Sequence, residues 1–206
     1  LAFGKHVYPK YVHTEGITGI TNEDVMYCND FGGAVKLIGW ASRRGNKAAV
    51  MVCPAFISGS SQLSSVNDVF NAILVSGDAT GDVVFYGKGA GKLPTASAVV
   101  SDIIIAAKMN DNSKSLYWED SQGEFVVDYK DLENKFYVRL ICSDKTKALE
   151  TAEKMWGTLH ILHREGELTE EAAFITERIE ERRFEQDCLN LSEFAEIKGK
   201  IRVLDY

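Results

Sequence analysis

The chain has little of several features that mark particular classes of protein. Only 3 of its 206 residues are proline, against 17 glycines, and 45% of the residues are hydrophobic. This composition is typical of a chain that folds, not of a low-complexity or disordered one. Basic residues are outnumbered by acidic residues, 23 to 30, and the net charge is -7. Because binding to a phosphate backbone favours positive charge, we expect no nucleic-acid partner.

Paired cysteines and long apolar runs are also missing. The four cysteines are far apart and form no C-x-x-C pair that could hold zinc or act as a redox dithiol; they are Cys28, Cys53, Cys142 and Cys188. We interpret them as buried thiols of a reducing cytosol. No apolar run approaches the roughly 20 residues that cross a bilayer, and the N-terminus lacks the order of a signal peptide. We therefore expect a cytoplasmic protein with no membrane partner and no metal site.

The start of the chain and its charge distribution indicate how it is divided. It begins Leu1-Ala2-Phe3-Gly4 without methionine, and glycine commonly follows the last turn of a helix, which suggests a piece of a longer protein. Residues 111–134 hold seven acidic against two basic residues and are rich in turn formers. We predict an acidic linker there, between a first region over residues 1–110 and a second domain over residues 135–206.

The first region is predicted to contain a helix, four strands and a second helix. Thr21 is a candidate N-cap of the first helix, with Asp24 at the positive end of its dipole. The strands are expected at residues 34–41, 48–56, 69–75 and 82–86 and should form one open antiparallel or mixed sheet. The second helix, over residues 96–108, is apolar on nearly every face. We expect it to be buried on most sides.

The second domain shows a regular order of strand, helix, strand, strand, helix, strand. The elements are expected at residues 136–142, 148–156, 159–162, 172–176, 179–191 and 197–204. The handedness of crossovers packs this order as a four-stranded antiparallel sheet with both helices on one face, the ferredoxin-like βαββαβ arrangement. The fold class of the whole chain is therefore α+β.

A glycine-rich stretch is the strongest candidate for a binding site. Tyr86-Gly87-Lys88-Gly89-Ala90-Gly91 runs from a strand into a helix whose first turn contains Pro94. Backbone N–H groups and the helix dipole can face an anion there, and phosphate is the natural guest. The spacing is neither G-x-G-x-x-G nor G-x-x-x-x-G-K-[ST], and a glycine turn before a helix can also be only a tight connection.

Several motifs of the first region resemble one enzyme family. They are Glu15-Gly16-Ile17, Lys36-Leu37-Ile38-Gly39, Val69-Phe70-Asn71-Ala72, Gly77-Asp78-Ala79-Thr80-Gly81, the stretch 86–99 and Asp102. Over about residues 1–109 they resemble the later half of homoserine dehydrogenase. The segment from Lys135 to the end resembles the small ACT-like domain that many bacterial forms carry at the C-terminus.

The resemblance implies an activity, and it also implies which part of the enzyme carries the catalytic residues. The family interconverts L-homoserine and L-aspartate 4-semialdehyde with NADP or NAD, on the route to threonine and methionine. Its Rossmann domain and catalytic lysine precede the residues matched here, so we expect no catalytic residue in this chain and no activity of the chain alone. Gly89, Ala90 and Gly91 are the residues expected to approach the cofactor. The family also implies a homo-oligomer, at least a dimer, built on the sheet region.

Other candidates are explained more simply. Lys36 lies in a strand and is expected to have a structural role. His160 and His163 could be read as a metal pair, but three residues along a strand separate them onto opposite faces. His6 and His13 have no partner visible in sequence and are expected at the surface. Glu15 and Asp24 could be read as paired carboxylates, although helix capping already explains Asp24.

An alternative function is a stand-alone regulatory ACT-type module that binds a small amino acid. Such domains usually turn from the first strand into the first helix through an acidic residue followed by proline and glycine. The corresponding stretch here is Ser143-Asp144-Lys145-Thr146-Lys147. Asp144 fits, but proline and glycine are absent, so we expect weak or no binding of threonine at this turn.

Overall fold

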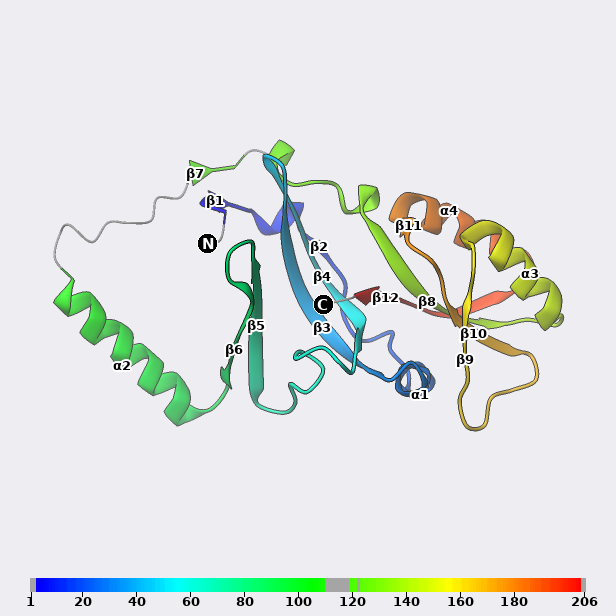
Figure 1. Ribbon diagram of the computed structural model, residues 1–206, viewed down its shortest axis with the longest axis horizontal. Helices are drawn as coiled ribbons and strands as arrows, with labels where there is room; N and C mark the ends of the chain where they lie inside the picture. The colour runs from blue at the N-terminus through cyan, green and yellow to red at the C-terminus, as the bar shows by residue number, and fades with distance from the viewer. Residues whose placement is uncertain (1–2, 110–118, 122, 205–206) are drawn as a thin grey trace.

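The core of the fold is one eight-stranded mixed sheet that runs through both halves of the chain. The computed structural model describes residues 3–109, 119–121 and 123–204 (Figure 1). The strands lie in the order β2-β4-β12-β8-β10-β9, with β3 also paired to β4 and β11 to β8. Their bounds are β2 (His13–Thr14), β3 (Gly33–Arg44), β4 (Lys47–Ser58), β8 (Glu133–Ile141), β9 (His160–Leu162), β10 (Glu171–Ile175), β11 (Ile179–Glu180) and β12 (Glu196–Leu204).

Strand β4 joins the two halves. On one side it pairs along its whole length with β3, in an antiparallel hairpin. On the other side its last residues pair in parallel with β12, where Ala55 lies opposite Arg202 and Ile57 opposite Leu204. Residues about 150 positions apart in sequence are therefore neighbours in one sheet.

Alternation along β8 places apolar side chains on both faces of the sheet. Phe136, Val138 and Leu140 pack with helices α3 (Lys145–Trp156) and α4 (Glu181–Leu191) in one core. Tyr137 points to the other face, where it packs against Tyr27 of helix α1 (Asn22–Asp30) and other core residues. Each fully buried large apolar side chain stabilises the fold by about 1.5–3 kcal/mol. The sheet is thus covered by helices on both sides.

Helix α1 begins as the sequence predicts. The hydroxyl of Thr21 accepts the N–H of Asp24, and the Asp24 carboxylate accepts the N–H of Thr21 at 2.9 Å. This reciprocal capping box satisfies backbone donors that the helix itself leaves unpaired. The predicted second helix of the C-terminal half begins two residues later than expected, because Ile179 and Glu180 pair with β8 as strand β11.

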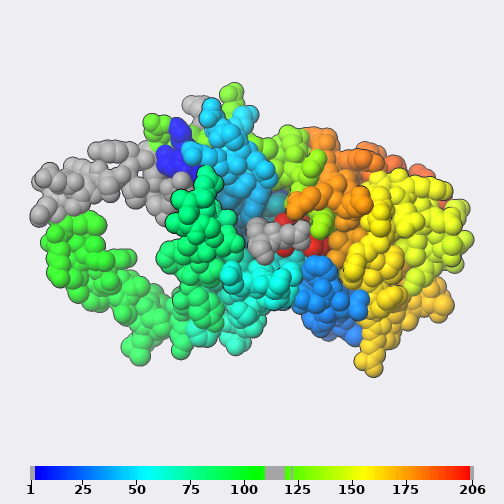
Figure 2. Space-filling view, in the orientation of Figure 1, coloured from blue at the N-terminus to red at the C-terminus, as the bar shows by residue number. Residues whose placement is uncertain are grey.

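Strands β5 (Phe70–Gly77) and β6 (Gly81–Lys88) and helix α2 (Lys92–Lys108) depart from the prediction. The two strands form a hairpin of their own instead of joining β3 and β4, so the single four-stranded sheet was wrong. Helix α2 has no buried residue, and Leu93 is 78% exposed, so the expected burial was wrong as well. Figure 2 shows α2 leaving the body as an arm. We call residues 70–108 the hairpin–helix arm.

The apolar side chains of the arm are exposed because no other element of the described ranges covers them. A helix that is apolar on all sides is stable in water only when other elements cover it. In the described ranges, α1 packs on one face of the part of the sheet that contains β8 and β12, and α3 and α4 pack on the other face. Strand β3 leaves side chains exposed, Leu37 among them at 53%, and α2 does not lie against it (Figure 1).

Candidate functional site

The predicted binding turn lies where β6 leads into α2. Gly91 is the N-cap of α2 and has a φ of 125°, a backbone conformation that residues with a Cβ rarely adopt. Gly89 donates its N–H to the carbonyl of Val69, and a Cβ on Gly89 would overlap the side-chain amide of Asn71. Ala90 lies between them, and all three residues are exposed. The backbone of the turn thus favours glycine at position 91, whereas at position 89 a Cβ would require the Asn71 side chain to move.

The electrostatics of this turn suit an anion. No side chain caps the N-terminus of α2, and its first turn carries no acidic residue. Lys88 and Lys92 flank the turn and are exposed. Unpaired N–H groups at the start of a 17-residue helix, together with the positive end of its dipole, favour a phosphate or carboxylate. The residues present therefore fit a phosphate group or another small anion.

The sequence did not predict a buried cluster of ion pairs around Arg202. The Arg202 guanidinium donates two hydrogen bonds of 2.6 Å to Glu181 and one of 2.8 Å to Glu15. Burial alone would raise the pKa of Glu15, but the hydrogen bond and charge of Arg202 outweigh it and hold that pKa below its usual value. His13 donates a hydrogen bond of 2.6 Å to the Glu15 carboxylate and stacks on Tyr129. His13 is therefore half-buried and not a surface residue as predicted.

A second buried cluster surrounds Asp24. Its carboxylate accepts hydrogen bonds of 3.0 Å from the Tyr137 hydroxyl and from Nε of Arg139. Arg139 also lies 3.6 Å from Glu171, which Arg164 binds through its guanidinium. Asp24 is fully buried. Helix capping is therefore only part of its role, because it also ties α1 to the second half of the chain.

Glu15 and Asp24 do not form a shared-proton pair. Each is engaged by a different arginine, Arg202 for Glu15 and Arg139 for Asp24. General acid–base work needs a carboxyl group that can exchange a proton with substrate. Nothing in the sequence indicated these partners, because Glu15 and Arg202 lie 187 positions apart.

The remaining candidates have structural roles. Lys36 donates to the carbonyl of Val66 at 2.5 Å and to the side chain of Asn67 at 2.8 Å, and so it ties down a loop. His163 pairs with Glu167 at 3.2 Å. Over the described ranges, no group of three or more His, Cys, Asp or Glu side chains is placed to hold a metal ion.

The cysteines are free and buried, as expected; they are Cys28, Cys53, Cys142 and Cys188. Burial raises the pKa of the Cys188 thiol to about 11, which keeps it protonated and unreactive at neutral pH. None of the helices in the described ranges combines the length and the apolar character that a membrane span needs.

Fold and site together define a mixed α/β protein with a glycine turn that fits an anionic, phosphate-bearing ligand. A sequence profile of the homoserine dehydrogenase family matches residues 1–104. The chain belongs to the homoserine dehydrogenase family.

Individual relatives agree with this assignment. Homoserine dehydrogenase of Bacillus subtilis is 43% identical over 108 residues, which are 52% of this chain and 25% of that protein. The Helicobacter pylori enzyme is 37% identical over 145 residues, 70% of this chain and 34% of that protein. A crystal structure of homoserine dehydrogenase from Thiobacillus denitrificans has a TM-score of 0.77 at 25% identity and covers 99% of this chain and 50% of that one.

A second solved structure is also similar to this chain. The homoserine dehydrogenase of Staphylococcus aureus at pH 7.0 gives a TM-score of 0.73 at 26% identity, over 98% of this chain and 50% of that one. The chain therefore spans about a quarter to a third of the curated relatives and half of the solved ones.

Proposed function

We propose that this chain supplies the later half of a cytoplasmic homoserine dehydrogenase, an oxidoreductase that interconverts L-homoserine and L-aspartate 4-semialdehyde with NADP or NAD for threonine and methionine synthesis. The observation that carries the proposal is the glycine turn at the start of α2, inside the residues that the family profile matches. Gly89, Ala90 and Gly91 are the residues proposed to approach the cofactor. Their exposed backbone and the flanking lysines support this role.

The exposed arm supports the proposal that the working enzyme is a homo-oligomer, at least a dimer. One face of the hairpin consists of two apolar cross-strand pairs, Ile73 with Phe85 and Val75 with Val83. Ile73 is 65% exposed and Phe85 is 62% exposed. Apolar patches of this kind usually mark surfaces that another polypeptide covers. We propose that a second copy covers the hairpin and that a dinucleotide-binding domain of the enzyme covers α2.

We expect the 206-residue chain alone to show no homoserine-dependent reduction of NADP or NAD. The physical reason is that, over the described ranges, its buried carboxylates are held in ion pairs by arginines, and its cofactor contacts are limited to one glycine turn. The measurement is absorbance at 340 nm with purified chain, homoserine and either cofactor. Turnover that survives further purification would show that the catalytic group lies within these residues.

We further propose that the chain divides as residues 1–110, a linker at 111–134 and an ACT-like domain at 135–206. The strand order β12-β8-β10-β9, antiparallel throughout, supports the ferredoxin-like arrangement of the last part. α3 and α4 pack in one core with Phe136, Val138 and Leu140 of β8, which places both helices on the same face.

Limited proteolysis should cut first between residues 110 and 134 and leave two resistant fragments that stay associated. They should stay together because β12 pairs with β4 and Asp24 with Arg139 across the cut. Denaturing and native electrophoresis of the same digest measure the two effects. Initial cleavage within residues 69–99 would show that the division is misplaced.

One observation at the expected turn argues against the alternative function. That alternative is a regulatory ACT-type module that binds an amino acid. The carboxylate of Asp144 accepts the N–H of Lys147 at 3.0 Å and so caps α3. Lys145 pairs with Glu167 at 2.5 Å. The donors that would hold a ligand carboxylate at this turn are therefore partly used within the protein, and we propose that it binds threonine weakly or not at all.

A further inference from the structure

The side chain of Asn71 reaches from β5 over the glycine turn. In the hairpin, Asn71 lies opposite Gly87, and Gly89 is its diagonal neighbour on the same face, within reach of a longer side chain. A Cβ added to Gly89 would lie 1.5 Å from Nδ2 and 2.6 Å from Cγ of Asn71. The amide of Asn71 therefore fills the space that a side chain at position 89 would need.

The amide group of Asn71 is not used by the protein. Within residues 3–109, 119–121 and 123–204 it has no hydrogen-bond partner, and Asn71 is exposed. A side-chain amide carries two N–H donors and one oxygen that accepts. Because the neighbouring Gly89, Ala90 and Gly91 are exposed as well, these donors are open to a ligand at the turn.

The lysine next to the turn lies on the other face of the hairpin. Lys88 is paired with Phe70, and its Nζ is 5.8 Å from the centre of the Phe70 ring. Side chains alternate between the two faces of a strand, so Lys88 and Asn71 are on opposite faces. Asn71 thus supplies hydrogen-bond donors on a face of the hairpin to which Lys88 is not directed.

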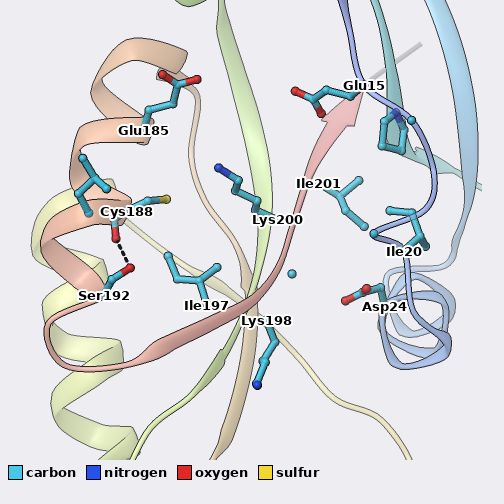
Figure 3. A pocket seen from close by; sticks show the side chains of 15 residues that line it. Glu15, Ile20, Asp24, Glu185, Cys188, Ser192, Ile197, Lys198, Lys200 and Ile201 are labelled. Carbon is cyan, nitrogen blue, oxygen red and sulfur yellow. Dashed lines mark hydrogen bonds between the residues drawn. The ribbon is translucent and has the colours of Figure 1, made fainter.

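A larger cavity lies elsewhere in the chain and is poorly suited to an anion. It has a volume of about 580 Å³ and is lined by the segment between β2 and α1 and by α4 and β12 (Figure 3). Its Lys200 lies between Glu185 on one wall and Glu15 on the other. These carboxylates repel a ligand that carries only negative charge, so the glycine turn is the better of the two places for a phosphate group.

We propose that Asn71 is a further residue of the cofactor site and that its Nδ2 donates a hydrogen bond to a phosphate group held at the first turn of α2. This inference rests on the proposed function, since the phosphate is that of NADP or NAD. It also explains the glycine at position 89, because a larger residue there would push the amide of Asn71 away from the turn.

The test uses a complete homoserine dehydrogenase that contains this chain, titrated with NADP and NAD. Asn71→Ala should weaken binding by about tenfold to a hundredfold, the usual effect of losing a hydrogen bond to a charged group, and should leave kcat at saturating cofactor nearly unchanged. Asn71→Asp keeps the shape but removes the donors and adds a negative charge, so its loss should be larger. An affinity of Asn71→Asp equal to or better than that of Asn71→Ala would overturn the proposal.

Ser76→Ala is the matched control. Ser76 is another exposed polar residue of β5 and lies opposite Asp82, at the far end of the hairpin from the turn. The change should leave the affinity for both cofactors unchanged, and thermal unfolding of each variant verifies the fold. A loss for Ser76→Ala as large as that for Asn71→Ala would attribute the effect to the hairpin as a whole and refute the role of the amide.

A double-variant cycle tests whether Asn71 and Gly89 share one space. Gly89→Ala alone should displace the amide and weaken cofactor binding about as much as Asn71→Ala. Gly89 has no positive φ, so alanine fits its backbone once the amide is gone. In the Asn71→Ala background, Gly89→Ala should therefore weaken binding by less than about twofold more. Losses that multiply would show that the two positions act independently, contrary to the proposal.

Gly91→Val distinguishes this inference from the proposed function, because it acts on the turn itself. If Gly91→Val weakens cofactor binding and Asn71→Ala does not, Asn71 is not a cofactor contact, although the proposed function stands. If neither variant weakens it, the cofactor site lies away from this turn and both proposals are refuted.

Discussion

Replacement of Asp24 by alanine is expected to lower the free energy of unfolding by about 3–5 kcal/mol, the usual cost of breaking a buried ion pair by removing one partner. The side chain of Arg139 is nearly as buried as that of Asp24, and it would lose its 3.0 Å contact. Tyr137 would lose its acceptor, and the N–H of Thr21 would lose its cap. Since domains of this size are stable by only about 5–15 kcal/mol, much of the protein's stability would be lost.

Urea unfolding followed by circular dichroism measures this effect, and a matched control lies on the same helix. Asp30 is an exposed aspartate of α1 whose carboxylate accepts the N–H of His163 at 2.8 Å. Asp30→Ala should cost less than about 1.5 kcal/mol, the net value of an ordinary hydrogen bond. A loss for Asp24→Ala no larger than that for Asp30→Ala would contradict the ion-pair argument.

A double variant separates the ion pair from the cap. Asp24→Ala combined with Arg139→Met removes both charges, so the buried guanidinium is no longer left without a counterion. The combined loss should therefore be smaller than the sum of the two single losses by about 1–3 kcal/mol. Additive losses would indicate that Asp24 acts only as a helix cap.

The N-terminus of α1 and the ion pairs near it show which contacts could be predicted from the sequence and which could not. The capping box uses Thr21 and Asp24, three residues apart, and so it can be predicted from a local pattern. The partner Arg139 lies 115 positions from Asp24, and a single sequence holds no signal for that contact. Glu15 and Arg202 are a second case of the same limit. Local chemistry was predictable here, but long-range pairing was not.

The hairpin–helix arm shows a different limit. Its strands and helix were predicted close to their observed bounds, because alternation and helical spacing are local properties. The packing of these elements was not predicted, because the burial of a side chain depends on which other element lies against it. The glycine turn between β6 and α2 was correctly placed at a strand-to-helix junction, and the positive φ of Gly91 gives a physical reason for glycine there.

Replacement of Gly91 by valine in a complete homoserine dehydrogenase that contains this chain is expected to weaken cofactor binding by about tenfold to a hundredfold. A branched Cβ would stand at the N-terminus of α2, where unpaired N–H groups are proposed to face the cofactor phosphates. Valine also disfavours a φ of 125°, so the turn would shift and misalign those groups. Both effects act on the same contact.

The control for this change is Gly87→Ala. Gly87 lies in β6, four residues earlier, where an added Cβ meets no atom within 4 Å and φ is not in the positive range. Titration of NADP and NAD, with thermal unfolding of each variant, separates binding from folding. Because the turn belongs to an arm outside the eight-stranded sheet, strain at Gly91 should leave the main unfolding transition in place. An unchanged affinity for both cofactors in Gly91→Val, with Gly87→Ala also unchanged, would remove Gly91 from the cofactor site.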